Sequence, residues 1–137
     1  MTGFILAALA LLVLSTPVIA SPSALVLNDL AAIQAPAEYE NIHVKALSSD
    51  QHASEFLIFI KKFVPLHRHE THSETIYVLE GVAEMQIGNK QYTLKKGSFI
   101  KVPQGVAHGV RVLSSTALKV LSVQAPEFFG KDRFSAE

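Results

Sequence analysis

From residue 42 onward, short runs of alternating or mainly apolar residues recur along the chain, with turn residues between them. These runs predict strands over 42–47, 55–64, 75–80, 82–87, 90–94, 98–102, 106–112 and 117–124. They are rich in Val, Ile and aromatic residues, which favour strands, whereas Gly, Pro and Asn occupy the positions between them. About eight short strands with regular turns indicate an all-β sandwich or barrel.

The first part of the chain has a different pattern. Residues 2–28 carry no charge, and a dense apolar run over 4–14 is followed by Pro17 and small residues up to Ala20. This pattern predicts a signal peptide over 1–20 with cleavage after Ala20, and therefore a periplasmic or secreted protein. The alternative is an uncleaved anchor, because about eighteen uncharged residues are enough to span a bilayer.

The remaining segments flank the predicted strands. Residues 21–41 are expected to form an N-terminal arm with a short helix over 29–34 that ends at Pro36. Residues 42–124 would form the β domain. Residues 125–137 would form a tail whose three phenylalanines either cover one end of the domain, or cover a partner subunit, or are loosely ordered.

Composition limits the possible functions. A chain of 137 residues has room for one domain. Lys plus Arg equals Asp plus Glu at 12 each, so nothing in the charge suggests a nucleic acid or an anionic membrane as partner. Cysteine is absent, so disulfides, thiolate nucleophiles and thiolate metal ligands are excluded. Any metal ion must be held by nitrogen and oxygen atoms.

A group of candidate metal ligands begins at His67 and His69. These residues are two apart, so on a strand both imidazoles leave the same face and can reach one ion. Glu74 lies an odd number of residues after His69, so it joins them only if the chain bends over 70–73. His108 lies on a later predicted strand and would face the interior.

Two blocks of sequence around these residues resemble the two motifs of the cupin family. The first motif, G-x5-H-x-H-x(3,4)-E-x6-G, is matched by His67, His69, Glu74 and Gly81, with Lys61 in place of its leading glycine. The second, G-x5-P-x-G-x2-H-x3-N, is matched by Gly97, Pro103, Gly105 and His108, with Val112 in place of its closing asparagine. The chain thus resembles a small single-domain, type-2 member of the cupin superfamily. That resemblance implies the double-stranded β-helix, or jelly-roll, barrel.

The resemblance also implies a metal site. Its ligands would be His67, His69, Glu74 and His108, bound to Fe, Mn, Ni, Co, Cu or Zn, ions that sequence alone does not separate. Four protein ligands on a six-coordinate ion leave two places for a small organic ligand. Because the histidines must be neutral to bind, metal affinity is expected to fall below about pH 6.

Several functions are compatible with such a site. The leading interpretation is a metal-binding protein that acts on a small organic molecule. The sequence leaves open whether it is an enzyme, which would be of dioxygenase, isomerase or lyase type with Glu74 and His72 as its candidate catalytic residues. The alternative is a noncatalytic periplasmic module that binds a sugar, a carboxylic acid or the metal itself. His43 and His52 have no partner at ligand spacing and are expected to be structural. A homodimer is expected from the resemblance, and no membrane partner after cleavage of the leader.

Overall fold

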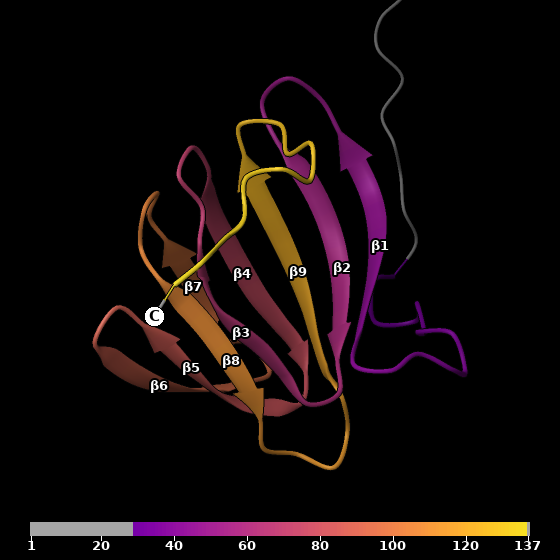
Figure 1. The fold of residues 1–137 in the computed structure, drawn as a ribbon. Coiled ribbons are helices and arrows are strands. Elements are labelled where there is room, and N and C mark those ends of the chain that lie inside the picture. Colours follow the sequence, from indigo (N-terminus) through magenta and orange to yellow (C-terminus); the bar gives the residue numbers. More distant parts are fainter. Residues whose placement is uncertain (1–28, 137) are drawn as a thin grey trace, which may run out of the picture.

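The structure, a computed structural model, describes residues 29–136, so the signal peptide expected over 1–20 lies outside the described residues. Two five-stranded antiparallel sheets face each other (Figure 1). The first has the strand order β1 (Ile42–Ser49), β2 (Ser54–Ile60), β9 (Leu118–Ala125), β4 (Ser73–Glu80) and β7 (Phe99–Val102). The second has the order β10 (Phe134–Ser135), β3 (Phe63–Arg68), β8 (His108–Val112), β5 (Val82–Ile87) and β6 (Lys90–Lys95).

The hydrophobic core lies between the two sheets, where the strands place every second side chain. On β4, Ile76 and Val78 are buried while Tyr77 faces outward and is 41% exposed. Val120 on β9 and Met85 on β5 approach the same core from the two sheets. The alternation read from the sequence therefore corresponds to inner and outer faces, and the predicted all-β jelly-roll fold is confirmed.

One predicted strand is in fact two. The run over 55–64 breaks at Lys61 and Lys62, where the chain leaves β2 in the first sheet and enters β3 in the second. Asn41 holds this break: its Oδ1 accepts a hydrogen bond from the Lys62 amide (2.9 Å), and its Nδ2 donates to the Phe63 carbonyl (2.8 Å). The prediction of a single strand was wrong because the break depends on Asn41, which lies 21 positions before Lys62.

The helix expected over 29–34 is also wrong. Residues 30–32 form a turn, in which the Ala32 amide donates to the Asp29 carbonyl. So short a helix is marginal by itself, and the structure has an isolated turn there instead. Lys119, 2% exposed on β9, donates from Nζ to the carbonyls of Ala31 (2.9 Å) and Ile33 (2.6 Å) and holds the arm in place.

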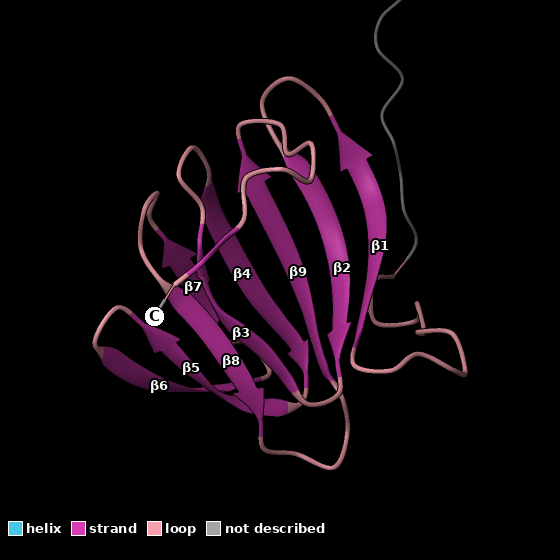
Figure 2. Cartoon of the chain, in the orientation of Figure 1, coloured by secondary structure: helices cyan, strands magenta, loops and turns pink. Residues whose placement is uncertain are grey.

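Residues 29–136 contain strands, turns and loops (Figure 2). Within this range no helix is present that is long and apolar enough to cross a membrane. After β9 the tail returns to the second sheet, where β10 pairs with β3 at Arg68 and His67 (Figure 1). The tail thus reaches the strand that carries the first predicted metal ligand.

Candidate metal centre

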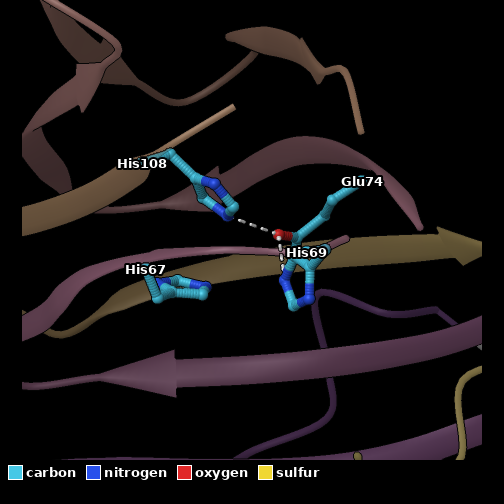
Figure 3. Close-up of side chains that lie close together, drawn as sticks. All are labelled: His67, His69, Glu74 and His108. Carbon is cyan, nitrogen blue, oxygen red and sulfur yellow. Dashed lines mark hydrogen bonds and ion pairs between the residues drawn. The ribbon is translucent and has the colours of Figure 1, made fainter. Parts of the chain in front are cut away.

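The four predicted ligands converge on one point between the sheets (Figure 3). One donor atom from each of His67, His69, Glu74 and His108 lies within 4.8 Å of the donor atoms of the other three. All four side chains are buried, with exposed fractions of 3–7%. His67 comes from β3, Glu74 from β4 and His108 from β8, so both sheets contribute.

The bend expected between the histidine pair and the carboxylate is present. β3 ends at Arg68, residues 70 and 71 form a bend, and β4 begins at Ser73. This bend changes the parity of the inward-facing positions, so Glu74 points inward despite its odd distance from His69. The Gly105 amide donates to the His69 carbonyl (2.7 Å), which ties the turn before β8 to this part of the site.

Each ligand histidine has its Nδ1 atom against a backbone carbonyl. The acceptors are the carbonyls of Pro65 for His67 (2.8 Å), Val106 for His108 (3.0 Å) and Asp132 for His69. A carbonyl can only accept, so in each neutral ring Nδ1 carries the hydrogen and Nε2 carries the lone pair. Two of these lone pairs, those of His69 and His108, face the Glu74 carboxylate (Figure 3).

Glu74 brings the negative charge to this group. The Ser122 hydroxyl donates to Oε1, while Oε2 lies 3.1 Å from His108 Nε2 and 3.7 Å from His69 Nε2. Burial by itself would raise the pKa of Glu74, but a proton held between its Oε2 and His108 Nε2, together with the hydrogen bond from Ser122, outweighs burial and holds the pKa below its ordinary value. Lone pairs and a carboxylate at these distances need a cation or a proton between them. This donor set therefore fits a divalent metal ion.

His67 is suited to bind as a neutral ligand. Burial, and next the proximity of His108, lower the pKa of His67 from 6.5 to about 4. Desolvation disfavours the imidazolium because a buried charge loses its hydration. His67 is therefore unprotonated at neutral pH, as a metal ligand must be.

The tail contributes Asp132, which the sequence reasoning missed. The Asp132 carboxylate accepts hydrogen bonds from the amides of Glu70 (2.8 Å) and Thr71 (2.9 Å), from the Thr71 hydroxyl and from His72 Nδ1. Burial opposes this charge, but the bonds from His72 and Thr71 hold the pKa of Asp132 well below its ordinary value. One aspartate in a tail has no spacing that could have signalled this role.

His72 lies outside the four-residue group. Its Nδ1 faces the Asp132 carboxylate, its Nε2 lies 2.9 Å from the Glu127 carbonyl, and its ring packs edge-on against Phe128. Burial would lower the pKa of His72, but the bonds to Asp132 and Glu127 raise it. In this position His72 connects the tail to the bend; the catalytic role predicted for it stays a prediction.

The two histidines expected to be structural lie away from the centre. His43 packs between the rings of Tyr39 and Phe59, with centroids 6.0 Å from each. His52 is exposed on the loop between β1 and β2, where its Nε2 lies 3.2 Å from the Gln51 amide nitrogen.

A cavity of about 230 Å³ opens onto the four ligands. Side chains from both sheets line it, and most of them are apolar, among them Ile58, Val110 and Val120. Apart from the four ligands, the polar side chains of its lining within residues 29–136 are Gln124 and Arg133. The cavity is thus an apolar well with its charged groups gathered near one place, which suits a small ligand that contacts a metal ion.

Comparison with known sequences agrees with this geometry. The sequence profile of the cupin domain matches residues 60–124. An uncharacterized protein of Aquifex aeolicus is 33% identical over 98 residues, which is 72% of this chain and 80% of that protein. Quercetin 2,3-dioxygenase of Bacillus subtilis is 38% identical over 63 residues, 46% of this chain but only 18% of that enzyme.

Solved structures show the same architecture. KdgF from a Halomonas species superposes with a TM-score of 0.62 at 20% identity, over 65% of this chain and 82% of that chain. TT1209 from Thermus thermophilus gives 0.62 at 26% identity, over 67% and 90%. An oxalate decarboxylase structure gives 0.63 at 20% identity, over 74% of this chain and 30% of that one. These matches support the double-stranded β-helix fold.

Proposed function

Because this chain belongs to the cupin family, we propose that it binds one divalent metal ion and acts there on a small organic molecule. The ligands are His67, His69, Glu74 and His108. One observation carries the proposal: three imidazoles, each with its Nδ1–H given to a backbone carbonyl, have their Nε2 atoms clustered with one buried carboxylate. Nitrogen and oxygen ligands suit Fe, Mn, Ni, Co, Cu or Zn.

The residues of the chain prepare the site for chemistry. A bound ion of this kind polarises a ligand oxygen as a Lewis acid, or exchanges electrons if it is redox-active. The apolar walls, Val110 and Val120 among them, exclude water and so strengthen electrostatic interactions inside the cavity. Glu74 is ionised at neutral pH and is the group within reach that either ligates the ion or takes a proton from the bound molecule.

A noncatalytic binding module for a sugar, a carboxylic acid or the metal itself is the second candidate. It is favoured by the position of His72, whose two ring nitrogens are engaged by Asp132 and Glu127. His72 does not line the cavity, and among residues 29–136 the lining contains no titratable base besides the proposed ligands themselves. The enzyme version is favoured by the likeness to quercetin 2,3-dioxygenase.

Elemental analysis of the purified protein after dialysis tests the proposal. We expect one metal ion per chain, and loss of that ion in His69→Ala and His108→Ala. His52→Ala is the matched control, because it removes an exposed histidine that lies away from the centre. A protein that retains no metal when each of the six ions is offered, or a His69→Ala variant that retains it fully, would overturn the proposal.

Turnover separates the two candidates. An enzyme should convert a member of a substrate panel, or consume oxygen, only with metal bound and only with His67 and His108 intact. A binding module should be stabilised by a member of the panel without converting it. Thermal shift and product analysis on the same samples give both results.

We further propose export with cleavage after Ala20, on the basis of the uncharged, apolar start of the chain. N-terminal sequencing of protein from the extracytoplasmic fraction should begin at Ser21.

The homodimer is proposed on the basis of family resemblance and of exposed aromatic side chains on the outer face of β4 and β7, Tyr77 at 41% and Phe99 at 68%. Light scattering should give twice the mass of one chain.

A further inference from the structure

Arg133 is an exposed residue that also lines the cavity. Its side chain comes from the tail just before β10 and lines the same cavity as the four ligands. Its Nη2 lies 3.4 Å from His67 Nδ1, but that nitrogen already donates to Pro65, so two donors face each other and no hydrogen bond forms. Within residues 29–136 Arg133 makes no ion pair.

Gln124 is a second polar group on the wall that lacks a partner. It is 7% exposed, and its Oε1 is buried without a hydrogen-bond partner among the described residues. Gln124 lies on β9 directly opposite Glu74 on β4, so it borders the metal centre. A buried amide of this kind is unfavourable unless a ligand or water satisfies it.

The charge of the cavity points to an anion. A divalent ion held by one carboxylate and three imidazoles would keep a positive charge, and the Arg133 guanidinium adds another on the lining of the same cavity. The apolar walls around the buried ligands strengthen the attraction for a negative ligand there, whereas Arg133 acts from the exposed side of the cavity. Guanidinium matches a carboxylate with two parallel hydrogen bonds, whereas it gains little from a neutral ester.

We propose that the ligand of this cavity is a small organic carboxylate, bound between the metal ion and Arg133, with a polar group that satisfies Gln124. This inference rests on the proposed metal site and names its class of ligand. The volume of about 230 Å³ lies below the range of about 300–1,000 Å³ usual for drug-sized ligands, so the carboxylate is short. Arg133 acts as a specificity residue.

Calorimetry on the cobalt-loaded protein tests the proposal. The probes are pyruvate, glycolate and malonate, each compared with its neutral methyl ester, and cobalt content is measured first for every variant. We expect at least one acid to bind tenfold or more tightly than its ester. Arg133→Gln should lower the affinity for that acid about tenfold and leave the affinity for its ester unchanged. The affinity of Arg133→Lys for the acid should lie between those of Arg133→Gln and the natural protein. Gln124→Leu should lower the affinities for the acid and for its ester by similar factors.

Lys131→Gln is the matched control. Lys131 is an exposed cation on the same tail that does not line the cavity, so its removal should leave every affinity unchanged. If cobalt is retained and no acid binds more tightly than its ester, or if Arg133→Gln binds the acid as tightly as Lys131→Gln does, the carboxylate proposal is overturned and the metal site stands. If the natural protein retains no cobalt or other divalent ion, both proposals fail.

Discussion

The ring orientation of each ligand histidine depends on one carbonyl. For His67 and His108 that carbonyl belongs to the residue two positions earlier, so a short piece of strand both carries the ring and sets its tautomer. For His69 the carbonyl belongs to Asp132, which is 63 residues away. Hydrogen bonds of this kind increase the basicity of the ligand nitrogen and fix its direction.

The lowered pKa of His67 predicts a loss of stability in acid. The ring titrates near pH 6.5 in the unfolded chain and near pH 4 in the folded, metal-free protein. Between these values the unfolded state binds more protons, so the free energy of unfolding falls as the pH falls, by about 2 kcal/mol after allowance for solvent screening. Urea unfolding of the chelator-treated protein at pH 7 and pH 4.5 measures this difference. His67→Asn should show a smaller one, and an equal loss in both proteins would contradict the assignment.

Both the backbone conformation and the close packing at position 81 require a glycine. Its φ is +87°, and a Cβ atom would lie 2.8 Å from the Ala117 carbonyl oxygen. Gly81→Ala should therefore lower the free energy of unfolding by about 3 kcal/mol or more, through left-handed strain and a backbone clash. Gly88→Ala is the control, since Gly88 has a φ of +55° but open space around it, and should cost only about 1 kcal/mol. Equal losses in urea unfolding would refute the role of the close approach.

At the scale of elements, the tail is the segment that completes the site. Phe128 packs edge-on against the rings of His69 and His72. Asp132 binds the bend between β3 and β4, and β10 adds a short pairing to β3. Arg133 is brought to the cavity wall by the same segment. The tail therefore fixes the direction of one ligand ring and adds a cation to the cavity.

Asp132→Asn tests this coupling. The variant keeps the backbone carbonyl that faces His69, but it removes the charge that the amides of residues 70 and 71 and His72 bind. Hydrogen bonds to a charged group contribute about 1.5–3 kcal/mol each, so we expect a stability loss of about 2 kcal/mol and metal affinity reduced about tenfold. Competition with a chromophoric chelator measures the affinity.

Asp50→Asn is the control for that measurement. Asp50 also accepts hydrogen bonds from two backbone amides, those of His52 and Ala53. It lies on the loop between β1 and β2, away from the ligands. Its replacement should reduce stability and leave metal affinity unchanged. If both variants retain full affinity, the tail has no influence on the centre.

At the scale of the whole molecule, the candidate metal ligands come from both sheets. Glu74 comes from the first sheet, whereas His67 and His108 come from the second. An ion bound to all of them is absent from the unfolded chain, so its binding free energy adds to the free energy of folding. A bound ion would therefore hold together the same interface as the apolar core.

Metal removal should consequently lower the melting temperature. With free ion at about 100 times the dissociation constant, binding contributes about 2.7 kcal/mol, which corresponds to a shift of about 10 °C for a domain of this size. Calorimetric melting with and without chelator measures the shift. His108→Ala should show none, and a chelator effect of the same size in that variant would indicate that the ion binds elsewhere.

Much of the candidate site was predictable because its information is local. The spacing of His67 and His69, the bend before Glu74 and the inward parity of His108 each involve a few neighbouring residues, and strand periodicity converts them into directions. The boundaries of β5 were predicted to the residue, since Gly81 and Gly88 mark both its ends. The break between β2 and β3 at Lys61 was not predicted, because Asn41, which stabilises it, lies about twenty positions earlier in the sequence.

The sequence by itself determined an all-β domain and the inner faces of its strands, because alternation acts within one strand, and its resemblance to the two cupin motifs named the four side chains that meet between the sheets. Only the tertiary structure decided that Asp132 orients His69, that Arg133 and Gln124 border the cavity, and that Lys119 holds the arm. The contacts of Asp132 and Lys119 join residues that lie 63 to 88 positions apart, and the positions of Arg133 and Gln124 depend on how the sheets close, so no local pattern encodes them.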